Sequence, residues 1–311
     1  MEKQNRITPT AIASGAADRG EVARSLVGSA GVLSGGPGLA AIAAPEYILG
    51  ADESERPRLL AQCEIHRREA ELLLEHIDVP LGGRAIDIGC GPLGVLDLLS
   101  ERVGRDGSVV GLDNEPRMLA FAQRTVSERA LANVTLALGD AVATSLPADS
   151  FDLAHARLVL VNHAEPEVVV REMVRVVRPG GAVALQEVDW ISWTCEPPHP
   201  AWDRLLTALV GAWRAARLDP FIGRRLAGIL RRAGLRDVDV AAHSHLWRAG
   251  DPYQTLLLKF ISIFQDRILE HGLLTIDELS RLTAELGAHL AQPETFVIYA
   301  LFFQAWGRKP A

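Results

Sequence analysis

Glycines and carboxylates gather between positions 87 and 113 in an order that favours binding of a nucleotide-containing cofactor. Asp87-Ile-Gly-Cys-Gly91 follows a short apolar stretch, and Gly94 completes the spacing Gly-x-Gly-x-x-Gly. Glycine at such a turn lets the backbone bend tightly and approach a ligand. Asp113 ends the next apolar stretch, where a carboxylate can accept hydrogen bonds from ribose hydroxyls. The pattern predicts a nucleotide-binding turn but does not by itself choose the nucleotide.

Four further features bear on that choice. Asp87 lies in an otherwise apolar segment, where a buried carboxylate needs a partner such as the ammonium group of an amino-acid tail. Pro92 removes a backbone donor where pyrophosphate binding would use one. Asp140, in Gly139-Asp-Ala141, can accept from an adenine amino group, and Arg178-Pro-Gly-Gly181 marks a sharp turn. These features favour a nucleotide with an amino-acid tail over the dinucleotide of a Rossmann-type NAD(P) oxidoreductase, which stays the alternative.

Strands and helices must bring these residues together. Short apolar segments alternate with amphipathic ones from Arg84 to Glu187, which predicts parallel strands joined by right-handed helical crossovers. Ligands of such sheets bind beyond the carboxyl ends of the strands. We expect strands at 84–88, 108–112, 134–138, 151–155 and 182–187, and helices at 52–76, 93–103, 115–130 and 165–177. Beyond residue 187 we expect helices at 202–216, 222–233, 252–271 and 275–290, an extended segment at 238–247 and a final strand at 295–306.

The order and spacing of these motifs resemble those of class I S-adenosylmethionine-dependent methyltransferases. The resemblance rests on Asp87-Ile-Gly-Cys-Gly91, Asp113 with Met118, Gly139-Asp-Ala141 and Arg175-Val-Val-Arg-Pro-Gly-Gly181. Tyr47-Ile-Leu-Gly50, Arg58-Leu-x-x-Gln62 and 296–310 look like the entry segment and the closing antiparallel strand of a bacterial subgroup that methylates small molecules. Leu93 departs from the family, which commonly has a glycine or small residue there, and we expect it to alter loop packing more than cofactor choice.

The resemblance implies a fold and a domain organisation. The fold class is α/β: a Rossmann-like, doubly wound sheet of seven mostly parallel strands with an antiparallel last strand, plus a helical cap. We expect a flexible N-terminal arm at 1–45, a methyltransferase core at 46–250 and 293–311, and a helical cap insertion at 251–292.

The resemblance also implies S-adenosylmethionine as the cofactor and a role for each matching residue. Gly89 and Gly91 would let the loop approach the methionine moiety, and Asp87 would support its amino group through the loop. Asp113 would hold the ribose. The other implied contacts are Met118, Asp140 and Ala141 at the adenine, Ala156 or Arg157 at the methionine end, and Tyr47, Arg58 and Gln62 closing the site from the N-terminal side.

Candidates for catalysis and acceptor binding follow the fourth and fifth strands. His163 can serve as a general base because histidine titrates near neutral pH, or it can bond local backbone. Glu187 and Asp189 point to the same face of a strand, where they can hold an amine, take a proton, or pair with an arginine. The aromatic residues suited to line an acceptor site, or to pack in the core, are Trp190, Trp193, Phe260 and Phe264.

Composition narrows the partners and the location. The net charge of -7 gives no electrostatic reason to expect nucleic acid, and no segment is long and apolar enough to span a bilayer. Three cysteines lie far apart without metal-ligand spacing, so we expect no metal and a reduced, cytoplasmic location. We therefore expect transfer of a methyl group to O, N or C of a small molecule in secondary metabolism, with a homodimer as one assembly. A cofactor-binding protein that does not methylate is a second alternative.

Overall fold

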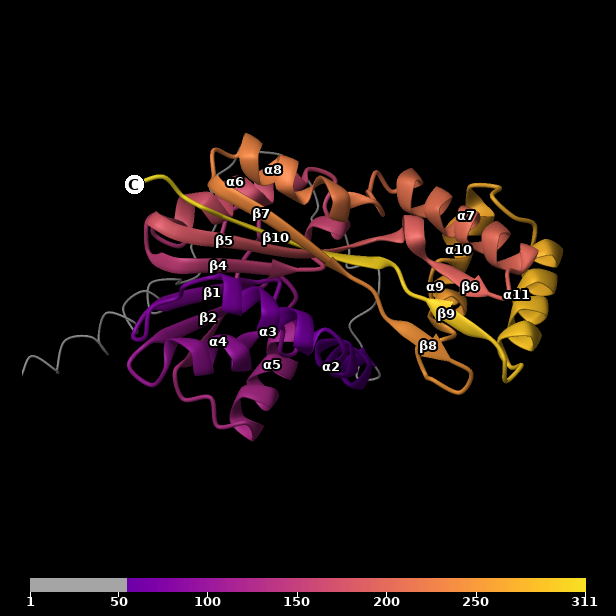
Figure 1. The fold of residues 1–311 in the computed structure, drawn as a ribbon, viewed down its shortest axis with the longest axis horizontal. Coiled ribbons are helices and arrows are strands. Elements are labelled where there is room, and N and C mark those ends of the chain that lie inside the picture. Colours follow the sequence, from indigo (N-terminus) through magenta and orange to yellow (C-terminus); the bar gives the residue numbers. More distant parts are fainter. Residues whose placement is uncertain (1–54) are drawn as a thin grey trace, which may run out of the picture. The chain divides into compact units, whose positions relative to one another are not determined.

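The computed structural model describes residues 55–311 (Figure 1), so Tyr47 and the predicted arm at 1–45 lie outside the described residues. Seven strands form one sheet in the order β3-β2-β1-β4-β5-β10-β7, in which β10 alone is antiparallel to its neighbours. This confirms the predicted fold class. The strands are β1 (Arg84–Ile88), β2 (Ser108–Asp113), β3 (Val134–Leu138), β4 (Phe151–Arg157), β5 (Val177–Asp189), β7 (Arg236–His243) and β10 (Leu301–Arg308).

The predicted final strand at 295–306 is split in two. Its first part, β9 (Phe296–Ile298), leaves the large sheet and pairs with β6 (Thr194–Glu196) and β8 (Leu246–Arg248). The chain turns at Tyr299, whose backbone N–H donates to the carbonyl of His245 at 2.9 Å. The sequence did not predict this small sheet because three-residue strands are too short to show an alternating pattern.

The crossover helices are α4 (Leu96–Val103), α5 (Pro116–Glu128) and α6 (Pro166–Val176), close to the predicted segments. The predicted helix at 52–76 is instead two helices, α2 (Glu55–Ile65) and α3 (Arg67–His76), which meet at His66. The backbone N–H of His66 still donates to the Gln62 carbonyl at 3.2 Å, and the His66 carbonyl accepts from Ala70 at 3.1 Å. The helix therefore bends at His66 while these hydrogen bonds continue.

The remaining helices follow β5. Those we call the C-terminal layer are α7 (Pro200–Ala215), α9 (Leu256–Ile263), α10 (Gln265–Glu270) and α11 (Ile276–Leu290), which pack on one another next to the small sheet (Figure 1). The predicted helix at 252–271 is broken at Phe264, and α8 (Leu226–Arg232) begins after a 3-10 turn. Thr275 caps α11 through a capping box with Glu278. Within residues 55–311, no helix is long and apolar enough to cross a membrane.

Candidate active site

The glycine loop after β1 has three glycines with positive φ, and the surroundings of the missing Cβ differ at each of them. A Cβ at Gly89 (φ +70°) would lie 2.4 Å from Val159 Cγ2, and one at Gly94 (φ +53°) would lie 2.0 Å from Asp87 Oδ2. A Cβ at Gly91 (φ +50°) would meet no atom of the described chain within 4 Å. Gly91 therefore faces open space at the carboxyl end of β1, where a cofactor would approach, whereas Gly94 makes room for Asp87.

Asp87 is buried beneath this loop and has partners for both carboxylate oxygens. Oδ2 accepts from the backbone N–H of Val95 at 2.9 Å, and Oδ1 accepts from His155 Nδ1 at 2.8 Å. Val95 is the N-cap of α4, and amides at a helix start are the groups that bind pyrophosphate in dinucleotide enzymes. Here the Asp87 carboxylate uses one of those amides, which argues against the dinucleotide alternative.

Polar side chains continue from Asp87 across the buried strands. His155 Nε2 lies 3.0 Å from the Gln186 side-chain amide, and Gln186 is the register partner of Gln304 on β10. Gln304 Nε2 donates to the backbone carbonyl of Glu69 at 2.6 Å. This row links the loop on β1 to helix α3. No spacing within one segment of the sequence reveals this row, because its members come from four strands and a helix.

Asp113 is held in place for a ligand at the end of β2. Its Oδ2 accepts from the backbone N–H of Gly91 at 2.9 Å, and its Oδ1 accepts from that of Glu115 at 3.0 Å. Burial raises the pKa of Asp113 above its usual range, and these two amides partly oppose that rise. Because each carboxylate oxygen has a second lone pair, Asp113 can still accept from ribose hydroxyls.

Of the predicted adenine residues, Met118 lies next to helix α2. Met118 is buried in a small cluster with Phe121 of α5 and Leu59 of α2. Arg56 fastens the same helices together by an ion pair with Glu128 at 2.7 Å. The structure thus places α2, which carries Arg58 and Gln62, beside Met118. Asp140 follows β3, where its Oδ1 accepts from the Val142 amide at 3.0 Å, and Ala141 is buried beside it.

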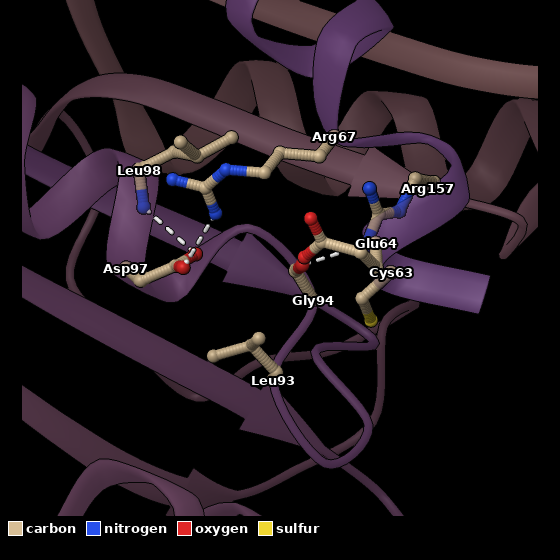
Figure 2. Close-up of a pocket in the computed structure, with 8 residues that line it drawn as sticks. All are labelled: Cys63, Glu64, Arg67, Leu93, Gly94, Asp97, Leu98 and Arg157. Carbon is tan, nitrogen blue, oxygen red and sulfur yellow. Dashed lines mark hydrogen bonds and ion pairs between the residues drawn. The ribbon is translucent and has the colours of Figure 1, made fainter. Parts of the chain in front are cut away.

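Helices α2 and α3 also cover the glycine loop (Figure 2). Cys63, Glu64 and Arg67 face Leu93, Gly94 and the first turn of α4 across a small pocket. Arg67 pairs with Asp97 at 2.8 Å, and Arg157 donates to the Gly94 carbonyl at 2.6 Å. Leu93 is buried under these helices, so its side chain packs the loop. Ala156, the alternative to Arg157 at the methionine end, is fully buried in β4.

The two carboxylates predicted for catalysis have partners within the protein. Glu187 is fully buried, and its Oε1 accepts from the backbone N–H of Leu160 at 2.6 Å, which holds the loop after β4. Burial raises the pKa of Glu187 to about 8. Asp189 forms a two-bond ion pair with Arg224, with Oδ1 2.5 Å from Nη2 and Oδ2 bonded to Nε. Of the alternatives open to Asp189, the structure shows the arginine pair.

His163 is half-buried at the end of the 3-10 turn after β4. Burial lowers the pKa of its imidazole below its usual range, and the nearby carboxylate of Asp140 partly opposes this. The ring is therefore mostly neutral at pH 7 and able to accept a proton. The catalytic roles of His163, Glu187 and Asp189 stay predictions.

The four predicted acceptor-binding aromatics come together in one buried cluster at the C-terminal layer. The ring centroids of Trp190 and Trp193 are 5.8 Å apart, and Phe260 lies within 6.0 Å of both. Phe264 contacts this group through Trp213, at 4.5 Å. Trp193 Nε1 is buried and has no hydrogen-bond partner among residues 55–311. The cluster thus combines packing with a buried donor that the described chain does not satisfy.

Tyr299 connects this aromatic cluster to His66, and the sequence analysis had singled out neither residue. The Tyr299 ring lies 5.6 Å from Trp193 and 6.3 Å from His66. Burial raises the pKa of Tyr299 far above its usual range, while the charge of Arg58 on α2 lowers it. The only signal in the sequence for these two residues is that Tyr299 is a polar residue within a largely apolar segment.

Comparison with known proteins agrees with this site. The sequence profile of a family described as a methyltransferase domain matches residues 85–181. A demethylmenaquinone methyltransferase of Geobacillus sp. (strain WCH70) is 31% identical over 197 residues, covering 58% of this chain and 82% of the relative. A trans-aconitate 2-methyltransferase of Methylobacterium radiotolerans is 34% identical over 197 residues, covering 62% of this chain and 70% of the relative.

Two further similarities are partial in sequence or confined to the fold. A 37.1 kDa protein in transposon TN4556 of Streptomyces fradiae is 34% identical over 175 residues, covering 56% of this chain and half the length of that protein. The crystal structure of the YcgJ protein from Bacillus subtilis has a TM-score of 0.54 at 17% identity, covering 78% of this chain and 100% of that one.

The profile match begins in β1 and ends in β5, and therefore contains the glycine loop, Asp113 and Asp140. The sheet order and the antiparallel β10 agree with the fold that the motifs implied. On these grounds, the chain belongs to the class I S-adenosylmethionine-dependent methyltransferase family.

Proposed function

We propose that this protein transfers the methyl group of S-adenosylmethionine to an oxygen, nitrogen or carbon atom of a small, planar, partly apolar molecule. The observation that carries the cofactor half of the proposal is Asp113, whose carboxylate two backbone amides fix beside the open face of Gly91. This arrangement suits a ribose diol and an adjoining amino-acid tail, and the hydrogen bond from the Val95 amide at the start of α4 to the Asp87 carboxylate disfavours a pyrophosphate in the same place.

The acceptor half of the proposal rests on the aromatic cluster that follows β5. Trp190, Trp193 and Phe260 pack on one another in a buried cluster whose aromatic character suits a planar molecule, and Trp193 Nε1 has a hydrogen to donate. The two relatives with named acceptors are named for demethylmenaquinone and trans-aconitate, which differ greatly in charge and shape. The aromatic lining favours an acceptor closer to the first of these.

Bound S-adenosylmethionine supplies the electrophilic methyl group, and the protein must align it with the acceptor. His163 is the better general base of the predicted residues, because it is mostly neutral at pH 7. Glu187 with a pKa of about 8 remains largely protonated at that pH, and Asp189 is paired with Arg224. Arg157, bonded to the glycine loop, would fix the loop around the methionine end.

The direct test is calorimetric titration of the protein with S-adenosylmethionine and with NADH, followed by assay for transfer of a labelled methyl group. The acceptor panel should contain quinols, catechols, planar amines and tricarboxylates. We expect S-adenosylmethionine to bind in preference to NADH and turnover to occur on planar ring compounds. Preferential binding of NADH would reject the cofactor assignment, and cofactor binding without turnover on any acceptor would favour the non-methylating alternative.

The proposal also includes the domain organisation, the cellular location and the assembly of the protein. The core would comprise 46–250 and 293–311, with 251–292 as a cap insertion; α9, α10 and α11 lie in that insertion, and each packs near α7. We further propose a cytoplasmic location, a role in secondary metabolism, a homodimeric assembly, and no nucleic acid or membrane partner. Size-exclusion chromatography with light scattering would test the assembly.

A further inference from the structure

His66, Glu69 and His245 bring three potential metal ligands together. His66 lies between α2 and α3, Glu69 is one helical turn later, and His245 comes from the loop between β7 and β8. One ligand atom from each lies within 4.8 Å of the other two. The separation of His245 Nε2 from Glu69 Oε1 is 3.3 Å, and two ligands of a tetrahedral zinc ion lie about 3.4 Å apart.

Each residue of this cluster has a buried ligand atom without a hydrogen-bond partner in the described chain, although His245 and Glu69 also approach each other as an ion pair. His66 is 2% exposed and Glu69 is 6% exposed. His66 Nδ1, Glu69 Oε2 and His245 Nε2 are all buried, and none has a hydrogen-bond partner among residues 55–311. Buried polar atoms are almost always satisfied, so an unpartnered atom on each of three clustered side chains indicates a missing partner shared by the three residues.

The rest of each side chain is held firmly. The His66 ring stacks on Phe302 with centroids 4.0 Å apart, and the His245 ring stacks on Trp247 at 5.2 Å. The backbone of Glu69 is fixed by the hydrogen bond from Gln304. Packing and hydrogen bonds around ligands of this kind fix their orientation before a metal arrives.

We propose that His66, Glu69 and His245 form a binding site for one divalent transition-metal ion with the ligand preferences of Zn²⁺. Two imidazoles and one carboxylate are ligands suited to zinc and leave a fourth position open for water or another oxygen ligand. The ion would join the helix pair α2–α3 to the β7–β8 loop, and the proposal does not depend on the identity of the methyl acceptor.

Metal binding to the full chain tests this directly. Protein freed of metal by a chelator and dialysed would be titrated with ZnCl₂ by calorimetry, and its thermal midpoint would be measured with and without zinc. We expect one zinc ion per chain and a rise in the thermal midpoint, since an ion that binds only the folded state stabilises it. Zinc-loaded crystals measured at the zinc edge should show anomalous density between the three side chains.

Variants separate this site from adventitious binding. His245→Ala and Glu69→Gln should each weaken zinc binding by more than about 100-fold, because losing even a group that only hydrogen-bonds to a metal ligand costs about 10- to 100-fold. His243→Ala is the matched control, because His243 lies two residues away at the end of β7 but outside the cluster, and it should bind zinc as the parent does. Glu69→Gln keeps the shape of the side chain, so it serves if His245→Ala fails to fold.

Three results would overturn the proposal. One is that the parent protein binds no zinc. Equal zinc binding by the parent, His245→Ala and Glu69→Gln would also overturn the proposal, because it would mean an adventitious ion only. The third is anomalous density elsewhere, for example between His199 and His289, whose rings are 4.7 Å apart. The diffraction experiment uses the unmodified chain, so it decides the question even where a variant is unstable.

Discussion

Buried polar groups are hydrogen-bonded differently in two halves of the site: the cofactor half at the ends of β1 and β2, and the acceptor half that begins at the end of β5. At the carboxyl ends of β1 and β2, Asp87 and Asp113 each accept two hydrogen bonds from the protein itself. From the carboxyl end of β5 onward, buried polar atoms remain without a hydrogen-bond partner among residues 55–311. They are Glu187 Oε2, Trp193 Nε1, His245 Nε2, Trp247 Nε1 and Gln304 Oε1, and the unpartnered Nδ1 of His66 belongs to a ring 5.6 Å from that of His245.

This difference indicates how far each half is complete without a ligand. The first half is preorganised, because its loop and both carboxylates are already hydrogen-bonded within the protein. The second half holds donors and acceptors whose burial is costly unless something satisfies them. We infer that the acceptor, a metal ion or ordered water supplies the hydrogen-bond or ligand partners that the second half lacks.

Removing Asp87 should have the largest effect, because the first half depends on it for stability. Asp87→Ala leaves Val95 N–H and His155 Nδ1 buried without their partner. At about 1–3 kcal/mol for each, the free energy of unfolding should fall by about 2–6 kcal/mol, measured by urea denaturation. Asp78→Ala, at an exposed position, should change it by at most about 0.5 kcal/mol. Equal effects of the two variants would contradict the preorganised loop.

Removing Asp113 should affect the cofactor more than the fold. Asp113→Ala should weaken S-adenosylmethionine binding by about 1–3 kcal/mol, the usual cost of unpairing buried polar groups, as measured by calorimetric titration. Asp106→Ala, on the exposed turn before β2, is the control and should bind as the parent does. Unchanged affinity in Asp113→Ala would put the ribose assignment in doubt.

In the second half, the raised pKa of Glu187 should make the free energy of unfolding depend on pH. Its pKa is raised from 4.5 to about 8 in the folded chain, so between these values the unfolded chain has lost a proton that the folded chain keeps. The stabilisation from the protonated carboxyl is complete below about pH 4.5 and is lost as the pH rises through about 8. From pH 6 to pH 7, the parent should lose about 1.4 kcal/mol of unfolding free energy more than Glu187→Gln.

Urea denaturation of both proteins at several pH values measures this slope. Glu270→Gln, at an exposed position at the end of α10, is the control and should keep the slope of the parent. Parallel profiles of unfolding free energy against pH for the parent and Glu187→Gln would show that Glu187 is ionised when folded. Glu187 would then no longer support the contrast between the two halves.

Trp193→Phe should give the smallest effect and the clearest division between the halves. The change keeps an aromatic ring but removes the unpartnered Nε1. If Nε1 donates to the acceptor, KM for the acceptor should rise about 2- to 10-fold, which corresponds to about 0.5–1.5 kcal/mol for one hydrogen bond. Affinity for S-adenosylmethionine should stay unchanged by calorimetry. A matching loss of cofactor affinity would show that the two halves are not separable.

The sequence by itself determined the sheet and the cofactor half. The glycine loop, Asp113 and Asp140 follow three successive strands, and periodicity within each segment is a local property that the sequence displays. Parallel strands joined by crossovers then require their carboxyl ends to share one edge. This is why the predicted strands at 84–88 and 134–138 agree with β1 and β3 residue for residue.

Only the tertiary structure decided where the N-terminal helical segment bends and how the elements beyond β5 are divided and paired. The bend at His66, the break at Phe264 and the three-residue strands of the small sheet arise from long-range packing, which overrides local pattern. Asp189 could be given an arginine partner from its chemistry, but that the partner is Arg224 depends on how the chain returns to β5. The cluster of His66, Glu69 and His245 joins residues that lie far apart in the sequence, and no spacing within one segment could reveal it.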